Sequence, residues 1–198
     1  LIHNHYKLKK IKVGHAGTLD PLASGLLVLC TGKMTKKIAD YQGQEKEYTG
    51  TITLGATTPS YDLETEVDQH FPIDHITEDL LENVAKKFVG EIEQYPPVFF
   101  FFLKERKRLY EYARAGEEVT IKARKIEISS FSLTRICLPE VDFTVRCSKG
   151  TYIRSLAHDF GKALGSGAHL SRLRRTAIGN LRVENAQRVA DFEEFLKA

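Results

Sequence analysis

The sequence predicts a single α+β domain in which a mixed, mostly antiparallel sheet is flanked by helices. Three observations carry this prediction. Residues 46–55 alternate strictly between two sets of side chains, as in a strand with one buried face. Residues 150–165 place apolar residues at helical spacing, which predicts a helix with one buried stripe. The remaining elements mix without the regular alternation of strand and helix that marks a parallel βαβ fold.

The first half of the chain contains two predicted strands and a helix. Residues 24–32 form a short apolar run between glycines, which is typical of a buried strand. The basic stretch 33–42 predicts a short helix. In the strand 46–55, one face carries Tyr48, Gly50, Ile52 and Leu54, and the other carries threonines. Residues 57–69 are polar and acidic, which indicates a loop.

The second half begins with a helix whose N-cap candidate is Thr77 and which ends at Gly90. A proline pair at 96–97 then interrupts regular structure. The further elements follow from the same periodicities: a short helix over 108–116, strands over 119–137 and 140–148, the helix 150–165 and a basic strand over 168–179.

Composition and cysteine content limit the class of protein. With 198 residues and 42% hydrophobic residues, the chain has enough material for one large domain with a sizeable core. No apolar run approaches membrane-spanning length. The three cysteines, Cys30, Cys137 and Cys147, form no CxxC pair. We therefore expect reduced thiols, a cytoplasmic location, no membrane contact and no bound metal.

The net charge of +3 hides an uneven distribution. Residues 1–40 carry seven Lys and Arg against two Asp, whereas residues 56–95 carry ten Asp and Glu against two Lys. Basic clusters return at 104–108 and 172–175. This pattern is compatible with a face that binds a polyanion and equally with ordinary solvated surface charge.

The stretch HAGTLDPLASG, residues 15–25, holds one carboxylate, Asp20, among small and apolar residues. Little side-chain bulk guards the loop, so a flat ligand could approach its backbone. The alternative is that Asp20 only ends a turn before Pro21, a common role of Asp-Pro.

Three more residues are candidates for the same site. Arg154 lies in the first turn of the predicted helix 150–165, where a cation opposes the helix dipole and gains from a carboxylate partner. That partner could be Asp20 or a local acid such as Asp159. Tyr48 could be a stacking platform for a base or a core tyrosine. His15 could contact a ligand or cap a turn.

Five motifs appear in order along the chain: GHAGTLDPLASGLL, KEYTGTITLG, RLYEYAR, GTYIRSLAHDFG and GAHLSRLRRTAIG. Together they resemble the TruB family of tRNA pseudouridine synthases, from about Lys12 to about Val189. The resemblance implies a pseudouridine-synthase catalytic domain over residues 1–189 and the start of a truncated C-terminal extension over residues 190–198. It also implies the isomerisation of a uridine to pseudouridine in the T loop of tRNA (position 55), without cofactor or metal, by a monomer that flips the target base.

The resemblance also implies residue roles. Asp20 would be the catalytic acid residue, acting as a nucleophile or as a ribose-side base. Arg154 would pair with it, and Tyr48 would stack on the uracil. Binding positions would include Tyr152 and Leu173 in the pocket, His15 in the space left by the flipped nucleotide, and Lys33 and Arg174 on phosphates.

The chain departs from the family pattern at two places. A Lys-Pro segment normally precedes the part seen here, so we expect the chain to be a fragment. In PPVFFFFLKERKR, the phenylalanines Phe99 to Phe102 include positions where the family has Ser and Ala. They predict an over-packed pocket or an exposed apolar patch.

Two other functions remain open at this level. A non-catalytic module of the same fold could bind tRNA and assist its folding. A glycoside or nucleoside hydrolase would need a second acid near Asp20, for which Glu45 and Glu47 are the candidates.

Overall fold

The computed structural model describes residues 11–97 and 122–197. Its centre is a seven-stranded sheet in which the strands follow the order β11-β10-β4-β9-β8-β7, with β2 added beside β10. The β2–β10 pairing is parallel and the other pairings in this sheet are antiparallel. The predicted α+β class with a mostly antiparallel sheet is therefore confirmed.

The strands of this sheet cover both halves of the chain. Their bounds are β2 Ser24–Gly25, β4 Lys46–Leu54, β7 Gly90–Gln94, β8 Arg124–Cys137, β9 Glu140–Cys147, β10 Ala168–Ile178 and β11 Leu181–Arg182. Two small ribbons accompany it: β1 (Val13–His15) with β3 (Leu29–Thr31), and β5 (Ala56–Thr57) with β6 (Gln69–His70).

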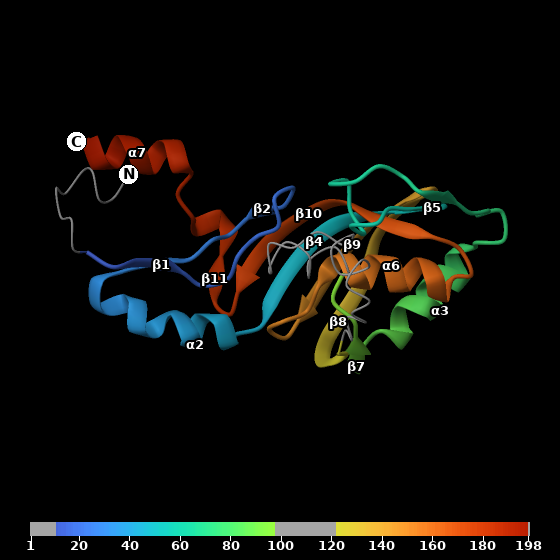
Figure 1. The fold of residues 1–198 in the computed structure, drawn as a ribbon, viewed down its shortest axis with the longest axis horizontal. Coiled ribbons are helices and arrows are strands. Elements are labelled where there is room, and N and C mark those ends of the chain that lie inside the picture. The colour runs from blue at the N-terminus through green and yellow to red at the C-terminus, as the bar shows by residue number, and fades with distance from the viewer. Residues whose placement is uncertain (1–10, 98–121, 198) are drawn as a thin grey trace, which may run out of the picture.

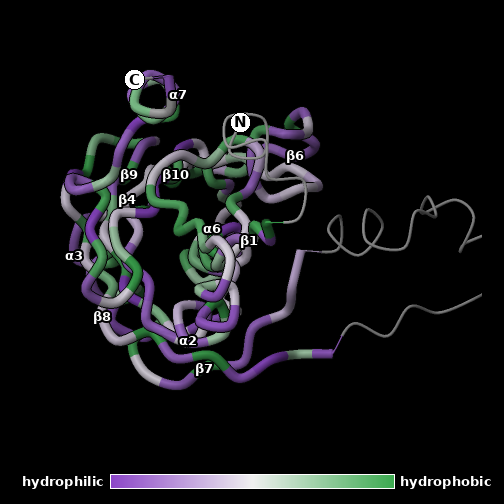
Figure 2. The backbone as a smooth tube through the Cα atoms, turned by 90° about the vertical axis from the view of Figure 1, so that its left-hand side faces the viewer, coloured by the Kyte–Doolittle hydropathy of each residue, from purple (hydrophilic) through white to green (hydrophobic). Residues whose placement is uncertain are grey.

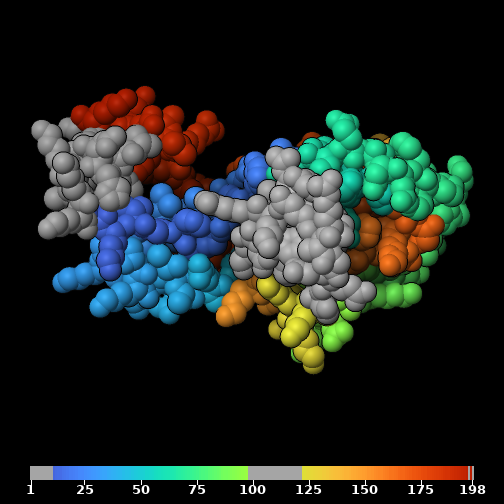
Figure 3. All heavy atoms as spheres, in the orientation of Figure 1, coloured from blue at the N-terminus to red at the C-terminus, as the bar shows by residue number. Residues whose placement is uncertain are grey.

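The helices are η1 Gly32–Lys37 and η2 Val183–Asn185 of the 3-10 type, and the α-helices α2 Ile38–Gly43, α3 Glu78–Lys87, α6 Ile153–Ala163 and α7 Val189–Lys197. Figure 1 shows β1, α2 and α7 at one end of the molecule and α3 and β5 at the other, with the sheet between them. In the space-filling view, the segment around β5 and β6 forms a surface layer at the end opposite α2 (Figure 3).

Local signals explain where α3 and α6 begin. The Thr77 hydroxyl accepts a hydrogen bond from the Leu80 amide at 3.2 Å, which caps α3 as predicted. The predicted helix 150–165 is observed as α6, which begins at Ile153, three residues later than expected, with Tyr152 at the N-cap position. Thr151 instead donates its hydroxyl to the Ser148 carbonyl and so closes the turn that leads into the helix.

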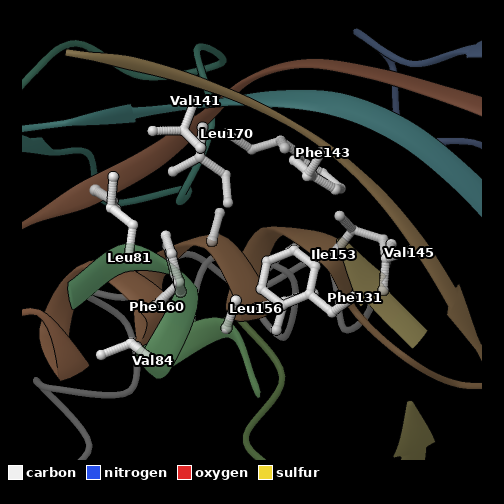
Figure 4. Packing of buried hydrophobic residues seen from close by; sticks show 14 of the residues in the cluster. Leu81, Val84, Phe131, Val141, Phe143, Val145, Ile153, Leu156, Phe160 and Leu170 are labelled. Atoms are coloured by element: carbon white, nitrogen blue, oxygen red, sulfur yellow. The ribbon is translucent and has the colours of Figure 1, made fainter. Parts of the chain in front are cut away.

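Helices α3 and α6 pack on one face of the sheet and enclose the main core. Figure 4 shows side chains of both helices meeting those of the strands above them, and Figure 2 shows α6 in the middle of the side view. The rings of Phe131, Phe143 and Phe160 meet edge to face at the centre. The face of β4 with Ile52 and Leu54 is buried here, as its alternation predicts.

The predicted single buried strand over 24–32 is wrong. The segment contains two short strands, β2 and β3, which join different sheets; Leu26, Leu27 and Val28 lie between them, and Leu27 and Leu29 are exposed. The cause is Gly25, whose φ of +106° turns the chain out of a regular strand. The predicted helix 33–42 is confirmed as η1 followed by α2, and the loop 57–69 is confirmed apart from the short strands at its ends.

Two further observations concern the described residues. None of their helices is both long and apolar enough to cross a bilayer. Cys30, Cys137 and Cys147 are free thiols, of which Cys30 and Cys147 are buried. The predicted helix 108–116 and the run from Phe99 to Phe102 lie outside the described residues.

Candidate active site

Asp20 lies in the loop between β1 and β2, and both arms of that loop are tied to the rest of the fold. The Ala16 amide donates to the Val28 carbonyl at 2.9 Å, and the Leu26 amide donates to the Arg175 carbonyl at 2.8 Å. Within the loop, the Ala23 amide donates to the Asp20 carbonyl at 2.9 Å and closes the turn at Pro21. The backbone thus presents the Asp20 side chain at a defined position, with 30% of that side chain exposed.

Arg154 projects from the first turn of α6 toward this loop. Its Nη2 donates to Oδ1 of Asp20 at 3.0 Å, and only 2% of the arginine side chain is exposed. A charge-assisted contact to a buried guanidinium orients the carboxylate and favours its ionised form. The structure therefore brings together the two residues, 134 positions apart, that the sequence proposed as partners.

The guanidinium of Arg154 is shared with two more carboxylates. Its Nη1 lies 3.6 Å from Asp62 and 3.6 Å from Glu64, and it donates to the Ser60 carbonyl at 3.5 Å. Asp62 is buried because its segment forms a parallel bridge with Leu170 of β10. Sequence reasoning missed both acids, since the segment 57–69 reads only as an acidic loop.

The electrostatic balance at Asp20 favours protonation more than in water. Burial raises the pKa of the Asp20 carboxyl, the Arg154 guanidinium lowers it, and the nearby Asp62 charge raises it again, with a net increase above the ordinary value. Arg154 therefore offsets part of the cost of keeping a charged oxygen in this loop.

A cavity of about 560 Å³ opens beside Asp20. Its lining includes four of the predicted site residues, Asp20, Tyr48, Tyr152 and Leu173, together with basic side chains from Lys46, Arg124, Lys125 and Lys149. A volume in this range is typical of sites for small organic groups. The lining combines flat rings, one carboxylate and cations, which suits an aromatic base attached to a phosphate backbone.

The structure indicates the protonation state of Tyr48 and the way in which Tyr152 is held in place. Burial is the main cause that raises the pKa of the Tyr48 hydroxyl, so this group stays a neutral phenol. Tyr152 is fixed through its backbone by the buried side chain of Gln94. The Gln94 amide donates to the Tyr152 carbonyl at 3.0 Å and accepts from the Tyr152 amide at 2.8 Å. Gln94 is a supporting residue that the sequence did not suggest.

Three predicted binding residues lie outside this cavity. His15 is exposed on β1, next to the lining residue Ala16, and Lys33 is exposed on η1. Arg174 is exposed and lines a second cavity of about 480 Å³ with Thr49, Thr51 and Arg172. The structure does not bring these three residues together with Asp20.

The two acids considered for a hydrolase are engaged elsewhere. Glu45 and Glu47 pair with Arg146 at 3.0 and 3.7 Å, and Glu47 also pairs with Arg182 at 2.9 Å. On β4, Glu47 alternates with Tyr48 and so faces away from the cavity that Tyr48 lines. Neither glutamate lines that cavity, so neither supplies a second acid for Asp20.

Comparison with known proteins places the chain in a family. The description "TruB family pseudouridylate synthase (N terminal domain)" matches residues 4–153, and "tRNA pseudouridylate synthase B C-terminal domain" matches residues 154–198. The boundary between the two matches falls inside α6. Since β10 pairs with β4, both matched parts contribute to one sheet.

Relatives and solved structures agree with these matches. The chain is 63% identical to tRNA pseudouridine synthase B of Flavobacterium johnsoniae over 189 residues, which cover 96% of this chain and 82% of the relative. It is 53% identical to the protein of the same name from Phocaeicola vulgatus, with 96% and 80% covered.

The fold is also similar to a chain in the crystal structure of a Cbf5-Nop10-Gar1 complex, with a TM-score of 0.67 and 31% identity. A chain in the structure of an H/ACA RNP bound to a substrate RNA containing 2'-deoxyuridine gives 0.64 and 30%. Each match covers 91% of this chain but less than half of the solved chain, 44% and 42%. From its sequence and its fold, the chain belongs to the TruB family of pseudouridylate synthases.

Proposed function

We propose that this protein converts a uridine in the T loop of tRNA, at position 55, into pseudouridine, with Asp20 as the catalytic residue. The observation that carries the proposal is the contact between Asp20 and the buried Arg154 at the edge of a cavity lined by Tyr48 and Tyr152. The relatives named tRNA pseudouridine synthase B support tRNA as the substrate class.

The target base enters the cavity by leaving its stack in the RNA. Base flipping costs a few kcal/mol, which stacking and contacts to the RNA backbone offset. The ring of Tyr48 offers a stacking surface, and Leu173 and Tyr152 complete the walls around a planar ring. A base seated against these walls displaces water from the reacting sugar carbon.

The reaction breaks the N1–C1′ glycosidic bond, turns the uracil while it is held, and joins C5 to C1′. The C5 proton is lost and N1 gains a proton, so the product is an isomer of the substrate. Asp20 acts either as a nucleophile or as a ribose-side base, and both routes require its ionised form. Arg154 favours this ionised form, because its charge lowers the pKa of Asp20 and so opposes the effect of burial.

Basic residues at the mouth of the cavity provide the RNA contacts. Lys125, Lys149 and Arg124 line the cavity, and we assign them to phosphates of the T arm. His15, Lys33 and Arg174 then contact parts of the RNA beyond the flipped nucleotide. We further propose a catalytic domain over residues 1–189 that acts as a monomer in the cytoplasm.

The experiment is release of tritium from a T-arm hairpin that carries [5-³H]uridine at the target position. The wild-type protein releases tritium, and Asp20→Asn abolishes release while RNA binding is retained. Asp74→Asn, which changes an exposed aspartate, is the matched control and keeps wild-type release. Release by the Asp20→Asn variant would show that another residue performs the chemistry.

The same assay separates the alternative functions. A non-catalytic tRNA-binding module binds the hairpin and releases no tritium. A hydrolase produces free uracil, which chromatography of the products detects. Only an isomerase gives tritium release together with an intact RNA chain and no free uracil.

A further inference from the structure

Strand β10 carries two neighbouring arginines with opposite environments. Arg174 is exposed, whereas Arg175 is only 2% exposed and is one of the largest fully buried side chains. Burying a guanidinium costs several kcal/mol unless hydrogen bonds replace its water. The partners of Arg175 therefore reveal what this buried charge stabilises.

The guanidinium of Arg175 donates to main-chain carbonyls of the loop that carries Asp20. Its Nε lies 2.8 Å from the Leu26 carbonyl oxygen, its Nη2 lies 3.1 Å from that of Gly17, and its Nη1 lies 3.5 Å from that of Thr18. Gly17 and Thr18 precede Asp20, and Leu26 follows it. One planar group with five donors thus connects both arms of the loop.

The backbone of Arg175 completes the attachment. Its carbonyl accepts from the Leu26 amide at 2.8 Å, and Gly25 pairs with it in the parallel β2–β10 bridge. A Cβ at Gly25 would lie 2.2 Å from the Arg175 carbonyl oxygen, so only glycine permits this approach. The loop of Asp20 is therefore held by both the main chain and the side chain of one residue.

Arg175 also lies next to Tyr48, the tyrosine in the wall of the cavity. It is the register partner of Tyr48 across the β4–β10 pairing, so the two side chains lie beside each other on one face of the sheet, and both residues line the cavity. The same residue therefore holds the loop that bears the carboxylate and lies beside the tyrosine on which the base would stack. The relative position of these two groups depends on Arg175.

We propose that Arg175 is a positioning residue, which sets the distance between the Asp20 carboxylate and the base held on Tyr48. This proposal rests on the catalytic role assigned to Asp20. The physical reason is that reactions of held groups depend steeply on placement: an error of about 1 Å costs about 100-fold in rate. Lysine cannot replace arginine here, because one ammonium group cannot span three carbonyls at different points of the loop.

The test compares Arg175→Gln and Arg175→Lys with the control Arg182→Gln. Arg182 is an arginine of the neighbouring strand β11 whose described partner is Glu47. For each variant, two quantities are measured with the T-arm hairpin: the single-turnover rate of tritium release and the RNA dissociation constant. Amide hydrogen exchange of the free protein is followed in residues 17–26 and, as a reference for global folding, in β9.

If Arg175 positions the site, Arg175→Gln lowers the single-turnover rate about 100-fold and leaves RNA affinity near the wild-type value. Exchange in residues 17–26 becomes faster while exchange in β9 stays the same. Arg175→Lys gives an intermediate rate and intermediate exchange. Arg182→Gln matches the wild type in every measurement.

Several outcomes would overturn the proposal. One is a wild-type rate and wild-type exchange of residues 17–26 in Arg175→Gln. Another is a loss of affinity without a loss of rate. If Arg175→Gln also exchanges fast in β9 and is therefore unfolded, Arg175→Lys decides, and a wild-type rate in that variant refutes the role.

Failure of the proposed function is distinguishable from these results. It would appear as tritium release by Asp20→Asn, whereas the exchange of residues 17–26 reports on the Arg175 contacts in the absence of RNA and of catalysis.

Discussion

Replacing Arg154 by glutamine removes the charge that three carboxylates share. The distances are 3.0 Å to Asp20 and 3.6 Å to each of Asp62 and Glu64. Asp20 and Glu64 keep contact with solvent, since 30% and 22% of their side chains are exposed. Asp62 does not, because only 6% of its side chain is exposed. The main cost of the substitution is therefore one buried carboxylate without its cation.

The expected loss of stability follows from this one buried carboxylate. Removing one partner of a buried ion pair costs about 3–5 kcal/mol, a large part of the roughly 5–15 kcal/mol by which proteins of this kind are stable. If the free energy of unfolding falls by about 3 kcal/mol per molar of urea, the urea concentration at the unfolding midpoint decreases by about 1–2 M. Exposed ion pairs contribute only about 0–1 kcal/mol, so Arg135→Gln, which breaks contacts to Glu140 and Asp142, is the matched control.

The assay is urea unfolding at about pH 7 and about pH 5, together with tritium release. A carboxylate buried without a cation has a higher pKa in the folded than in the unfolded protein, so its cost declines as the pH falls. The deficit of Arg154→Gln therefore shrinks at the lower pH. Adding Asp62→Asn removes the stranded charge and restores stability, but activity stays lost because Asp20 still lacks its partner.

Two results would refute this reasoning. An unchanged urea midpoint in Arg154→Gln would mean that the three carboxylates do not depend on the guanidinium. Recovery of tritium release in the double variant would mean that Arg154 serves only the stability of the fold and does not orient Asp20.

Three more predictions follow from single contacts. Gly25→Ala lowers the thermal midpoint, because positive φ alone costs about 1–3 kcal/mol and the added Cβ meets the Arg175 backbone, whereas Gly43→Ala faces open space and has little effect. Arg174→Gln reduces the slope of log affinity against log salt by about 0.7–0.9, if that residue contacts one phosphate; an unchanged slope in binding titrations would exclude the contact. Since burial raises the pKa of Asp20 and its ionised form is needed, the acid limb of the rate-pH profile lies above the ordinary value of 3.8, and a limb below it would contradict the assignment.

Periodicity was sufficient for the elements that border the core. The alternation in β4 and β9 and the stripe of α6 each have one face against the same apolar side chains, so the pattern and the burial agree. It failed over residues 24–32, where an apolar run was read as one strand. That run contains a positive-φ glycine and a parallel pairing to a strand far along the chain, and neither leaves a periodic signal.

In the candidate site, too, some residues could be predicted from the sequence and others could not. The residue pattern singled out Asp20, Arg154 and Tyr48, and the resemblance to a family added Tyr152. The structure places these residues around one cavity or in contact with its lining. Residues that act on those four were not predicted. Asp62 depends on a bridge between a loop and β10, and Gln94 depends on two hydrogen bonds to a backbone 58 positions away. Such contacts are set by tertiary packing, which one sequence does not display.

The separation in sequence between Asp20 and its two arginines has a consequence for synthesis on the ribosome. A nascent chain that extends through β9 already contains Asp20, but it lacks both Arg154 and Arg175, which lie up to 158 positions from the residues they hold. At roughly 5–20 residues per second, Arg175 is added roughly 8–30 s after Asp20. The loop that carries Asp20 therefore gains its last side-chain contacts only after β10 has been synthesised, and a polypeptide terminated before β10 lacks the hydrogen bonds of Arg175 that hold this loop.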